Sequence, residues 1–220
     1  METLRDILAA AADGCFPPAD GRTRIVAQPS ERDAGVVSFT AHSVVFTDED
    51  PEWVRETLRA VAAESDPLSA PLHPRFLTAL MDRTGRTTGT VDVLSVGSPL
   101  PGTPALPLTE VRDPDHPRAA RARRHRDDVR VWTVDGGLLV LGRGVAGRME
   151  VAVEVTEHAQ HRGLGRALVR AARQLTGEPV WGQVAAGNAR SLRAFQAAGY
   201  RPVGCEALLG RAGGQRKTPV

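Results

Sequence analysis

Two glycines stand where a segment of alternating apolar residues gives way to an amphipathic one, and this junction constrains the fold more than any other part of the chain. Residues 149–155 (MEVAVEV) alternate with the period of a β-strand, and the apolar residues of 164–175 recur with the period of an α-helix. Gly163 and Gly165 lie at the start of that helix. Because glycine adopts backbone conformations barred to other residues, it lets N–H groups approach a ligand closely. The junction therefore predicts a strand, a glycine turn and a helix, with either an anion site there or simply a tight turn.

Charge around the turn favours the anion site. Arg162 and Arg166 belong to the segment QHRGLGR, which spans residues 160–166. The start of the helix adds the positive end of its dipole. The spacing matches neither the Walker phosphate loop nor the dinucleotide fingerprint, so the nucleotide classes that use those motifs are not supported. The segment instead predicts a cradle for a pyrophosphate group.

Strands and helices alternate through the second half of the chain. Strands are predicted at 106–111, 129–134, 149–155, 179–186 and 200–209, and helices at 114–128, 164–175 and 188–199. The last helix has Asn188 as N-cap and Gly199 as C-cap. Because the late helices connect strands, the predicted fold class is α/β, with a mixed central sheet and helices on both faces.

A domain boundary is predicted near residue 104. Four prolines, at 99, 101, 104 and 107, favour an extended linker or a long surface crossing. The total charge is nearly balanced, with 28 basic and 26 acidic residues, yet acidic residues are in excess before this point and basic residues after it. We therefore expect a smaller N-terminal α+β domain at 1–104 and a second domain at 105–220.

The N-terminal part predicts ordered elements without a recognisable chemistry. Residues 36–47 predict a strand or a bent pair of strands. Asp50 and Pro51 are typical of a helix start, and a strand is expected at 90–96. The single histidines of this half, His42 and His73, are interpreted as structural.

Composition excludes several classes of protein. Cys15 and Cys205 are too few for a disulfide framework and lack the spacing of a zinc site. No apolar run approaches the ~20 residues that span a bilayer. Glu2 and Asp6 stand where a signal peptide would be basic, so we expect a cytoplasmic protein. An aromatic content of 4% argues against a stacking surface for single-stranded nucleic acid.

The sequence VEVTEHAQHRGLGRALV resembles the coenzyme A signature of the GNAT N-acetyltransferases, Q/R-x-x-G-x-G/A after a strand. A second family element follows in order, with Asn188 after a strand and the Gly199–Tyr200 pair before the last one. The resemblance covers roughly residues 105–210. It implies an acetyl-CoA-dependent acyltransferase fold in which two splayed parallel strands hold the pantetheine arm, with acetyl-CoA as acyl donor and no metal. Residues 1–104 would be an accessory domain or a degenerate second copy of the same fold.

The resemblance also implies which residues bind the cofactor. The backbone of Val153 and Val155 would pair with pantetheine, and Asn188 and its helix would contact the lower part of the cofactor. The implied set is Val153, Val155, Gln160, His161, Arg162, Gly163, Leu164, Gly165, Arg166, Asn188, Ser191 and Phe195.

The catalytic groups depart from the family pattern, because two positions that carry them in many family members are not ionisable. Phe195 stands where a tyrosine acts as general acid, and Gln183 stands where some members have a glutamate base. Glu154 is then the candidate base, directly or through water, and Glu150 a weaker one. The alternative is that Glu154 is an ion-pair partner of the arginine-rich segment 118–130. Tyr200 is the candidate acid, although its position is typical of a core residue.

The predicted function is acetyl transfer from acetyl-CoA to a primary amine of a small molecule or protein. The alternative is a catalytically weak acyl-CoA-binding sensor or scaffold. The N-terminal domain is expected to shape the acceptor site or a homodimer interface, with no membrane contact. The arginines of 118–130 predict a solvated face or the recognition of an anionic substrate, and nucleic acid is the weakest of the interpretations.

Overall fold

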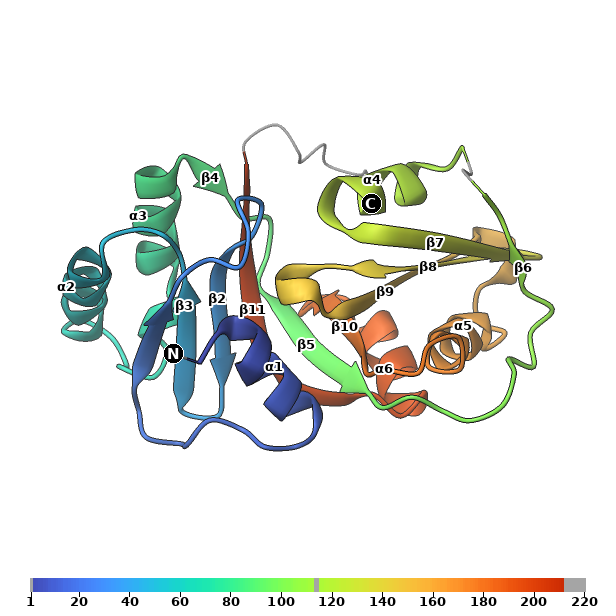
Figure 1. Cartoon of the computed structure of the whole chain (residues 1–220), viewed down its shortest axis with the longest axis horizontal. Coiled ribbons are helices and arrows are strands. Elements are labelled where there is room, and N and C mark those ends of the chain that lie inside the picture. Colours follow the sequence, from blue (N-terminus) through green and yellow to red (C-terminus); the bar gives the residue numbers. More distant parts are fainter. Residues whose placement is uncertain (1, 113–114, 212–220) are drawn as a thin grey trace. The chain divides into compact units, whose positions relative to one another are not determined.

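The computed structural model describes residues 2–112 and 115–211, which form helices and strands of one mixed sheet (Figure 1). The helices are α1 (Leu4–Ala12), α2 (Pro51–Ala62), α3 (Pro74–Thr84), α4 (Pro117–His125), α5 (Leu164–Ala172) and α6 (Ala189–Ala197). The strands are β1 (Thr23–Val26), β2 (Ala34–Phe39), β3 (His42–Phe46), β4 (Arg86–Thr87), β5 (Asp92–Gly97), β6 (Thr109–Glu110), β7 (Asp127–Val134), β8 (Gly137–Arg143), β9 (Met149–Val155), β10 (Val180–Ala185) and β11 (Arg201–Arg211). Short 3-10 turns lie at Ala70–Leu72, Val145–Gly147 and Glu157–Ala159.

The chain forms two compact units whose boundaries differ from the predicted one. One unit contains the chain up to Val93 together with the chain from Gly204 onward, and the other is Leu94–Val203. The change of unit falls inside β5 and inside β11, so two strands contribute residues to both. The strands of the N-terminal half belong to the same sheet as the later ones. A separate N-terminal α+β domain is therefore not shown.

In the first unit, β1, β3, β2 and β11 lie next to one another in that order. The predicted bent pair at 36–47 is an antiparallel hairpin of β2 and β3. Its Val36 and Val45 pack in one core with apolar residues of α2 and α3. Asp50 caps α2 by accepting a hydrogen bond from the Glu52 N–H at 2.9 Å, which confirms the predicted helix start.

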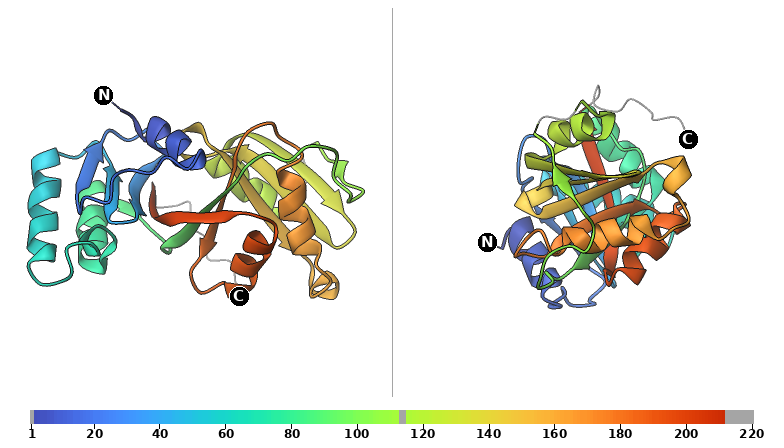
Figure 2. Two further views of the ribbon diagram at one scale, coloured as in Figure 1. Left: turned by 90° about the horizontal axis from the view of Figure 1, so that it is seen from below. Right: turned by 90° about the vertical axis from the view of Figure 1, so that its right-hand side faces the viewer.

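In the second unit, β7, β8 and β9 form an antiparallel meander covered on both faces. Leu139 and Leu141 of β8 share a core with α5, whereas Leu138 and Val140 share one with α4. Because successive side chains of a strand point to opposite faces, α5 and α4 cover opposite faces of these strands. Helices α5 and α6 pack against each other (Figure 2). The predicted arrangement of helices on both faces is confirmed for this unit.

The proline-rich segment crosses the surface of the second unit. The Leu100 N–H donates to the Arg173 carbonyl at 2.7 Å, and the Gln174 side chain donates to the Thr103 carbonyl at 3.2 Å. Leu106 and Leu108 pack against the core that contains α5. Of the two interpretations of the prolines, the structure shows the surface crossing, because these contacts tie the segment to α5.

Candidate functional site

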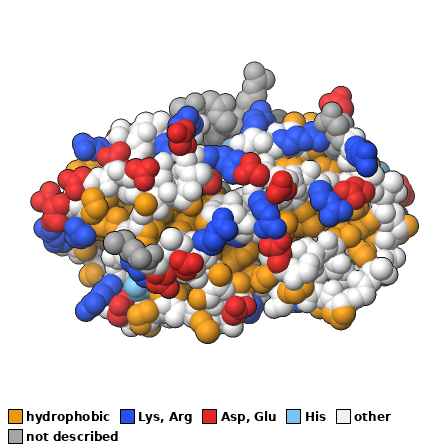
Figure 3. Space-filling model, viewed as in Figure 1, with side chains coloured by type: hydrophobic (Ala, Val, Ile, Leu, Met, Phe, Trp, Pro, Cys, Tyr) orange, Lys and Arg blue, Asp and Glu red, His pale blue; other side chains and the backbone are white. Residues whose placement is uncertain are grey.

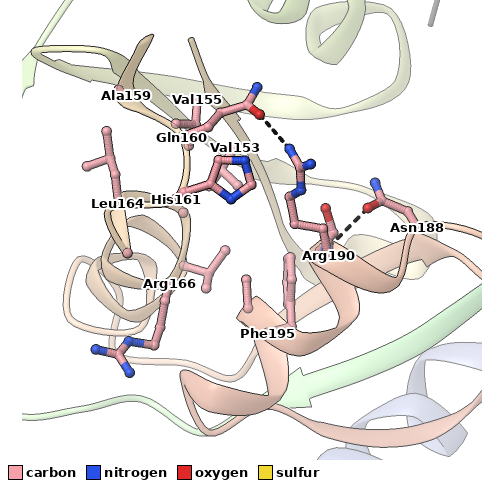
Figure 4. A pocket seen from close by; sticks show the side chains of 15 residues that line it. Val153, Val155, Ala159, Gln160, His161, Leu164, Arg166, Asn188, Arg190 and Phe195 are labelled. Carbon is pink, nitrogen blue, oxygen red and sulfur yellow. Dashed lines mark hydrogen bonds between the residues drawn. The ribbon is translucent and has the colours of Figure 1, made fainter. Parts of the chain in front are cut away.

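A cavity of about 410 Å³ lies in the second unit, among β9, the turn before α5 and the start of α6 (Figure 4). Eleven of the twelve residues predicted to bind a cofactor line it, namely Val153, Val155, Gln160, His161, Gly163, Leu164, Gly165, Arg166, Asn188, Ser191 and Phe195. The twelfth, Arg162, is exposed and does not line it. Four lining residues were not predicted, namely Ala159, Val169, Arg190 and Ala194. The cavity thus gathers residues of two segments that lie far apart in the sequence.

One wall of the cavity exists because two parallel strands diverge. β10 pairs with β9 only at Val180 with Met149 and at Trp181 with Glu150. Beyond Glu150 the two strands separate, while β9 remains paired with β8 on its other edge. Val153 and Val155 lie in this separated part and line the cavity. The β9 edge there carries peptide groups outside the ladder with β10, which an extended ligand could use.

The glycine turn leaves the start of α5 open to the cavity. Gly163 is the N-cap of α5 in a left-handed conformation, with φ 81°, and supplies no capping side chain. A Cβ atom built on Gly163 meets nothing within 4 Å, and one built on Gly165 meets only Val155 Cγ2 at 3.7 Å. The first N–H groups of a helix have no intrahelical partner, so they remain available to an acceptor here. Of the two interpretations of the glycines, an anion site and a tight turn, the open space at this turn favours the anion site.

The ionisable side chains that line the cavity are all basic. They belong to His161, Arg166 and Arg190, and no Asp or Glu is among the lining residues. Arg190 was missed from the sequence, although its place two residues after the N-cap Asn188 sets it in the first turn of α6. Its guanidinium donates to Gln160 Oε1 at 2.5 Å (Figure 4). The walls therefore favour a ligand with negative charge.

The part of the cavity at Val169, Ala194 and Phe195 is apolar. The Phe195 ring lies against Gly182 of β10, where a Cβ atom would stand 2.1 Å from Phe195 Cε1. It also meets the Tyr200 ring edge-on, with 4.8 Å between the ring centroids. A glycine on β10 is what allows the aromatic ring to lie this close to the strand.

Asn188 has a structural role that the sequence predicted. Its side-chain oxygen accepts a hydrogen bond from the Ser191 N–H at 3.0 Å, as an N-cap does. The predicted C-cap is displaced by one residue, since Ala198 is the C-cap and Gly199 follows it with φ 82°. Asn188 also lines the cavity, and its amide nitrogen takes no part in this capping bond.

The carboxylates of β9 lie on the face opposite the cavity. Glu154 alternates with the lining residues Val153 and Val155, and its Oε2 accepts a hydrogen bond from Arg118 Nε at 2.7 Å. His116 Nε2 stands 3.9 Å from Glu154 Oε1. Of the two interpretations of Glu154, the geometry matches the ion-pair partner of the arginine-rich helix. Glu154 points away from the cavity, so its position does not favour the predicted role as general base.

Glu150 is held more tightly on the same face. It is 3% exposed and accepts hydrogen bonds from Arg126 Nε at 2.9 Å and Arg148 Nε at 2.8 Å. Burial on its own raises the pKa of Glu150, but the two guanidinium groups outweigh it and hold the pKa below its usual value. A carboxylate that is ionised and doubly hydrogen-bonded is a poor proton acceptor, so Glu150 serves as an internal counter-ion.

Tyr200 is a buried residue of the core. Its hydroxyl donates to the Val169 carbonyl at 2.9 Å, and burial raises its pKa far above the usual value. It does not line the cavity. A phenol that is committed to a backbone carbonyl and has a raised pKa is poorly placed to protonate a leaving group.

The arginine-rich segment 118–130 is partly neutralised by ion pairs. Arg118 pairs with Glu154, Arg126 with Glu150, and Arg130 with Glu110. On the face drawn in Figure 3, basic and acidic side chains are interspersed. The Arg126–Glu150 pair is largely buried, whereas Arg121, Arg123 and Arg124 are exposed, which supports the interpretation of a solvated face for that part of the segment.

Neither a metal site nor a membrane span is found among the described residues. No three of their His, Cys, Asp or Glu side chains come together in a way that could hold a metal ion. No helix of residues 2–112 and 115–211 combines the length and apolar character that a membrane span requires.

Comparisons with known proteins found structural likeness only. No protein-family model matches the chain, and no curated protein matches its sequence. A GCN5-related N-acetyltransferase from Kribbella flavida is 20% identical, with 84% of this chain and 90% of that chain covered and a TM-score of 0.41. A GNAT-family acetyltransferase from Colwellia psychrerythraea is 6% identical, with 80% and 81% covered and a TM-score of 0.45.

A GCN5-related N-acetyltransferase from Sphaerobacter thermophilus is 15% identical, with a TM-score of 0.36. The match covers 61% of this chain and spans about half the length of that one, 55%. All three solved structures are thus named as acetyltransferases of one family. The chain resembles the GNAT acetyltransferases. Its own activity has to follow from the residues of its cavity.

Proposed function

We propose that the protein is a GNAT-type N-acetyltransferase that takes acetyl-CoA as acyl donor and a primary amine of a small molecule or protein as acceptor. One observation carries this proposal. The cavity runs from the edge of β9 that has separated from β10 to the open glycine turn at α5, and its ionisable lining residues are all basic. A long ligand with an extended amide arm and a pyrophosphate group has the chemistry of these two ends.

The residues present fit the groups of coenzyme A. The edge of β9 at Val153 and Val155, which lies outside the ladder with β10, would hydrogen-bond the amides of the pantetheine arm. The open N–H groups at the start of α5, with Arg166 and His161, would hold the pyrophosphate. The thioester of acetyl-CoA would supply an activated acyl group. The residues of the cavity would orient this group and neutralise the phosphates of the coenzyme.

The lining residues offer no carboxylate or phenol for proton transfer. Glu154 is paired on the opposite face, the Tyr200 hydroxyl is engaged with a carbonyl, and Phe195 carries no proton. His161 also lines the cavity, but it belongs to the turn before α5 to which we assign the pyrophosphate. Transfer by this chain therefore requires an amine that arrives already neutral. This favours acceptors with a low pKa, such as an α-amino group (pKa about 7.7–8.0), over a lysine side chain (pKa about 10.4).

The same observation favours the second candidate function, an acyl-CoA-binding sensor or scaffold with little catalysis. The two are separated by the rate of acetyl transfer to a panel of amines of graded pKa. An acetyltransferase without a base of its own gives a rate that follows the neutral fraction of each amine as the pH changes. Slow hydrolysis of acetyl-CoA, equal for all amines, supports the sensor.

Glu154→Gln tests whether the β9 carboxylate takes part after all. A general base contributes about 10²–10⁴-fold to the rate, so its loss would be obvious. From its position on the opposite face we expect the rate to change less than about twofold, with a small loss of stability from the broken, half-exposed ion pair. A drop of a hundredfold at unchanged acetyl-CoA affinity would restore Glu154 as the base.

Binding itself is tested by Gly163→Asp. A carboxylate at this left-handed N-cap projects into the open space of the cavity, where it repels a pyrophosphate. We expect coenzyme A affinity, measured by calorimetry, to fall at least about tenfold. Gly102→Asp is the matched control, because Gly102 has a similar left-handed φ of 83°, is exposed, has open space around it and lies outside the cavity. No saturable heat for the wild type at millimolar coenzyme A would rule out the proposed function.

A further inference from the structure

Arg190 reaches across the cavity from α6 to the turn before α5. It is exposed, lines the cavity and donates to Gln160 Oε1 at 2.5 Å, so one hydrogen bond links two walls of the cavity (Figure 4). No carboxylate among the described residues forms an ion pair with Arg190. The guanidinium therefore holds a neutral amide, in a cavity whose other ionisable lining groups, His161 and Arg166, are basic as well.

This arrangement is weaker than the one a phosphate would offer. An ionised oxygen adds the attraction of opposite charges to the hydrogen bond of a guanidinium, and the planar fork of the guanidinium matches two oxygens of a phosphate. An amide oxygen such as that of Gln160 accepts without a compensating charge. A phosphate group entering beside α6 would therefore take the guanidinium from Gln160.

We propose that Arg190 is a phosphate-binding residue that exchanges Gln160 for a phosphate of the ligand. It thereby makes the cavity selective for phosphorylated forms over the bare pantetheine arm. The inference rests on the proposed function for the identity of the ligand. The phosphate could be the pyrophosphate or the 3′-phosphate of coenzyme A, and these two sources are separated by experiment. The rival explanation is that Arg190 and Gln160 form a structural link that persists in the complex.

The experiment compares Arg190→Gln with Arg193→Gln. Arg193 lies one turn further along α6, is exposed and does not line the cavity, so it controls for the loss of one charge on this helix. Calorimetry with coenzyme A should show a loss of about tenfold in affinity for Arg190→Gln and less than about twofold for Arg193→Gln. Pantetheine, which carries no phosphate, should bind both variants and the wild type equally.

One further ligand, 3′-dephospho-coenzyme A, identifies which phosphate Arg190 binds. If Arg190 binds the 3′-phosphate, 3′-dephospho-coenzyme A binds Arg190→Gln and the wild type equally. If it binds the pyrophosphate, dephospho-coenzyme A shows the same tenfold loss. A lower melting temperature of Arg190→Gln with unchanged coenzyme A affinity would overturn the inference in favour of the structural link.

Inorganic pyrophosphate makes the failure of this inference distinguishable from the failure of the proposed function. If the wild type binds pyrophosphate in an Arg190-dependent way but does not bind coenzyme A, the proposed function falls and the phosphate role of Arg190 stands. If coenzyme A binds and no phosphorylated ligand responds to Arg190→Gln, the inference falls and the function stands. If neither ligand binds the wild type, both fall.

Discussion

At the scale of single residues, Arg173 ties together the ends of two elements in the second unit. Its Nε donates to the Ser98 carbonyl at 2.7 Å and its Nη1 to the Ala198 carbonyl at 2.5 Å. Gly97 and Gly199 leave room for it, since a Cβ atom would lie 2.8 Å from Arg173 Cδ at the first and 2.5 Å from Nη1 at the second. Burial lowers the pKa of this guanidinium, which disfavours its charged form. The hydrogen bonds to the two backbone carbonyls offset this cost.

Arg173→Met should therefore destabilise the fold. The substitution keeps an unbranched side chain but leaves two carbonyls without their donor, which costs about 2–4 kcal/mol in the free energy of unfolding. Arg170→Met is the matched control, because Arg170 lies in the last turn of α5, whose C-cap is Arg173, and is exposed. We expect it to change stability by less than about 0.5 kcal/mol. Urea denaturation followed by circular dichroism measures both, and equal midpoints would contradict the assigned role.

Glu150 gives a prediction about pH. Its pKa in the folded state lies below the ordinary value of 4.5, so the ionised carboxylate stabilises the fold above about pH 4.5. This contribution is lost as the pH falls below 4.5 through the folded-state pKa. Glu150→Gln should lower the free energy of unfolding at pH 7 by about 3–5 kcal/mol, because two buried guanidinium groups lose their counter-ion.

The stability gap between Glu150→Gln and the wild type should narrow as the pH falls below 4.5. Glu110→Gln is the comparison, since Glu110 also pairs with an arginine and has a lowered pKa but is exposed. Its loss should cost less than about 1 kcal/mol. A gap for Glu150→Gln that stays constant from about pH 7 to pH 3 in urea titrations would show that the ionisation of Glu150 does not stabilise the fold.

At the scale of elements, the contact between α6 and β10 sets the shape of the apolar part of the cavity. Gly182→Ala places a methyl group where Phe195 now lies, 2.1 Å from its Cε1. The ring has to move, and its neighbour Tyr200 is buried, so we expect it to shift toward the cavity. Overpacking of this kind costs about 1–3 kcal/mol.

Coenzyme A affinity should fall with stability in Gly182→Ala, and the double variant Gly182→Ala/Phe195→Leu should recover most of the affinity because the smaller side chain frees the space. Gly187→Ala is the control, since Gly187 is exposed and a methyl group added to it would have no neighbour within 4 Å. Calorimetry and thermal unfolding measure the two effects. Undiminished affinity of Gly182→Ala would show that Phe195 does not bound the ligand's space.

At the scale of the whole molecule, the two compact units are interleaved in sequence. Residues 205–209 of β11 pair with β2 in the first unit, and Ala207 and Leu209 belong to its core. The second unit includes the β5 residues Leu94 and Val96, which are buried and precede the predicted boundary. A cut near residue 104 therefore removes a strand from each unit.

Fragments 1–104 and 105–220 should each be poorly folded when expressed alone. Each exposes apolar surface that the missing strand covers in the intact chain. Co-expression should restore soluble protein and coenzyme A binding, as judged by co-purification and calorimetry. A fragment 105–220 that is monomeric, gives dispersed amide NMR signals and binds coenzyme A would show instead that it is an independent domain.

Short-range features of the sequence are sufficient to specify the local parts of this protein. The alternation of 149–155, the glycines at 163 and 165 and the cap residue Asn188 act within a few residues of chain, so they predicted β9, the turn before α5 and the start of α6. Together with the family resemblance, they also named most of the residues that line the cavity. The conformational freedom of glycine and the capping hydrogen bonds depend on residues that are close in the sequence, so the sequence alone predicts them.

The longer-range partners depend on the folded chain as a whole. That Glu154 meets Arg118 depends on which helix covers which face of β9, and that Arg190 meets Gln160 depends on how far β9 and β10 diverge. The pairing of β11 with β2 likewise joins segments from opposite ends of the sequence. Such contacts are fixed by packing over the whole sheet, and no local pattern of residues contains that information.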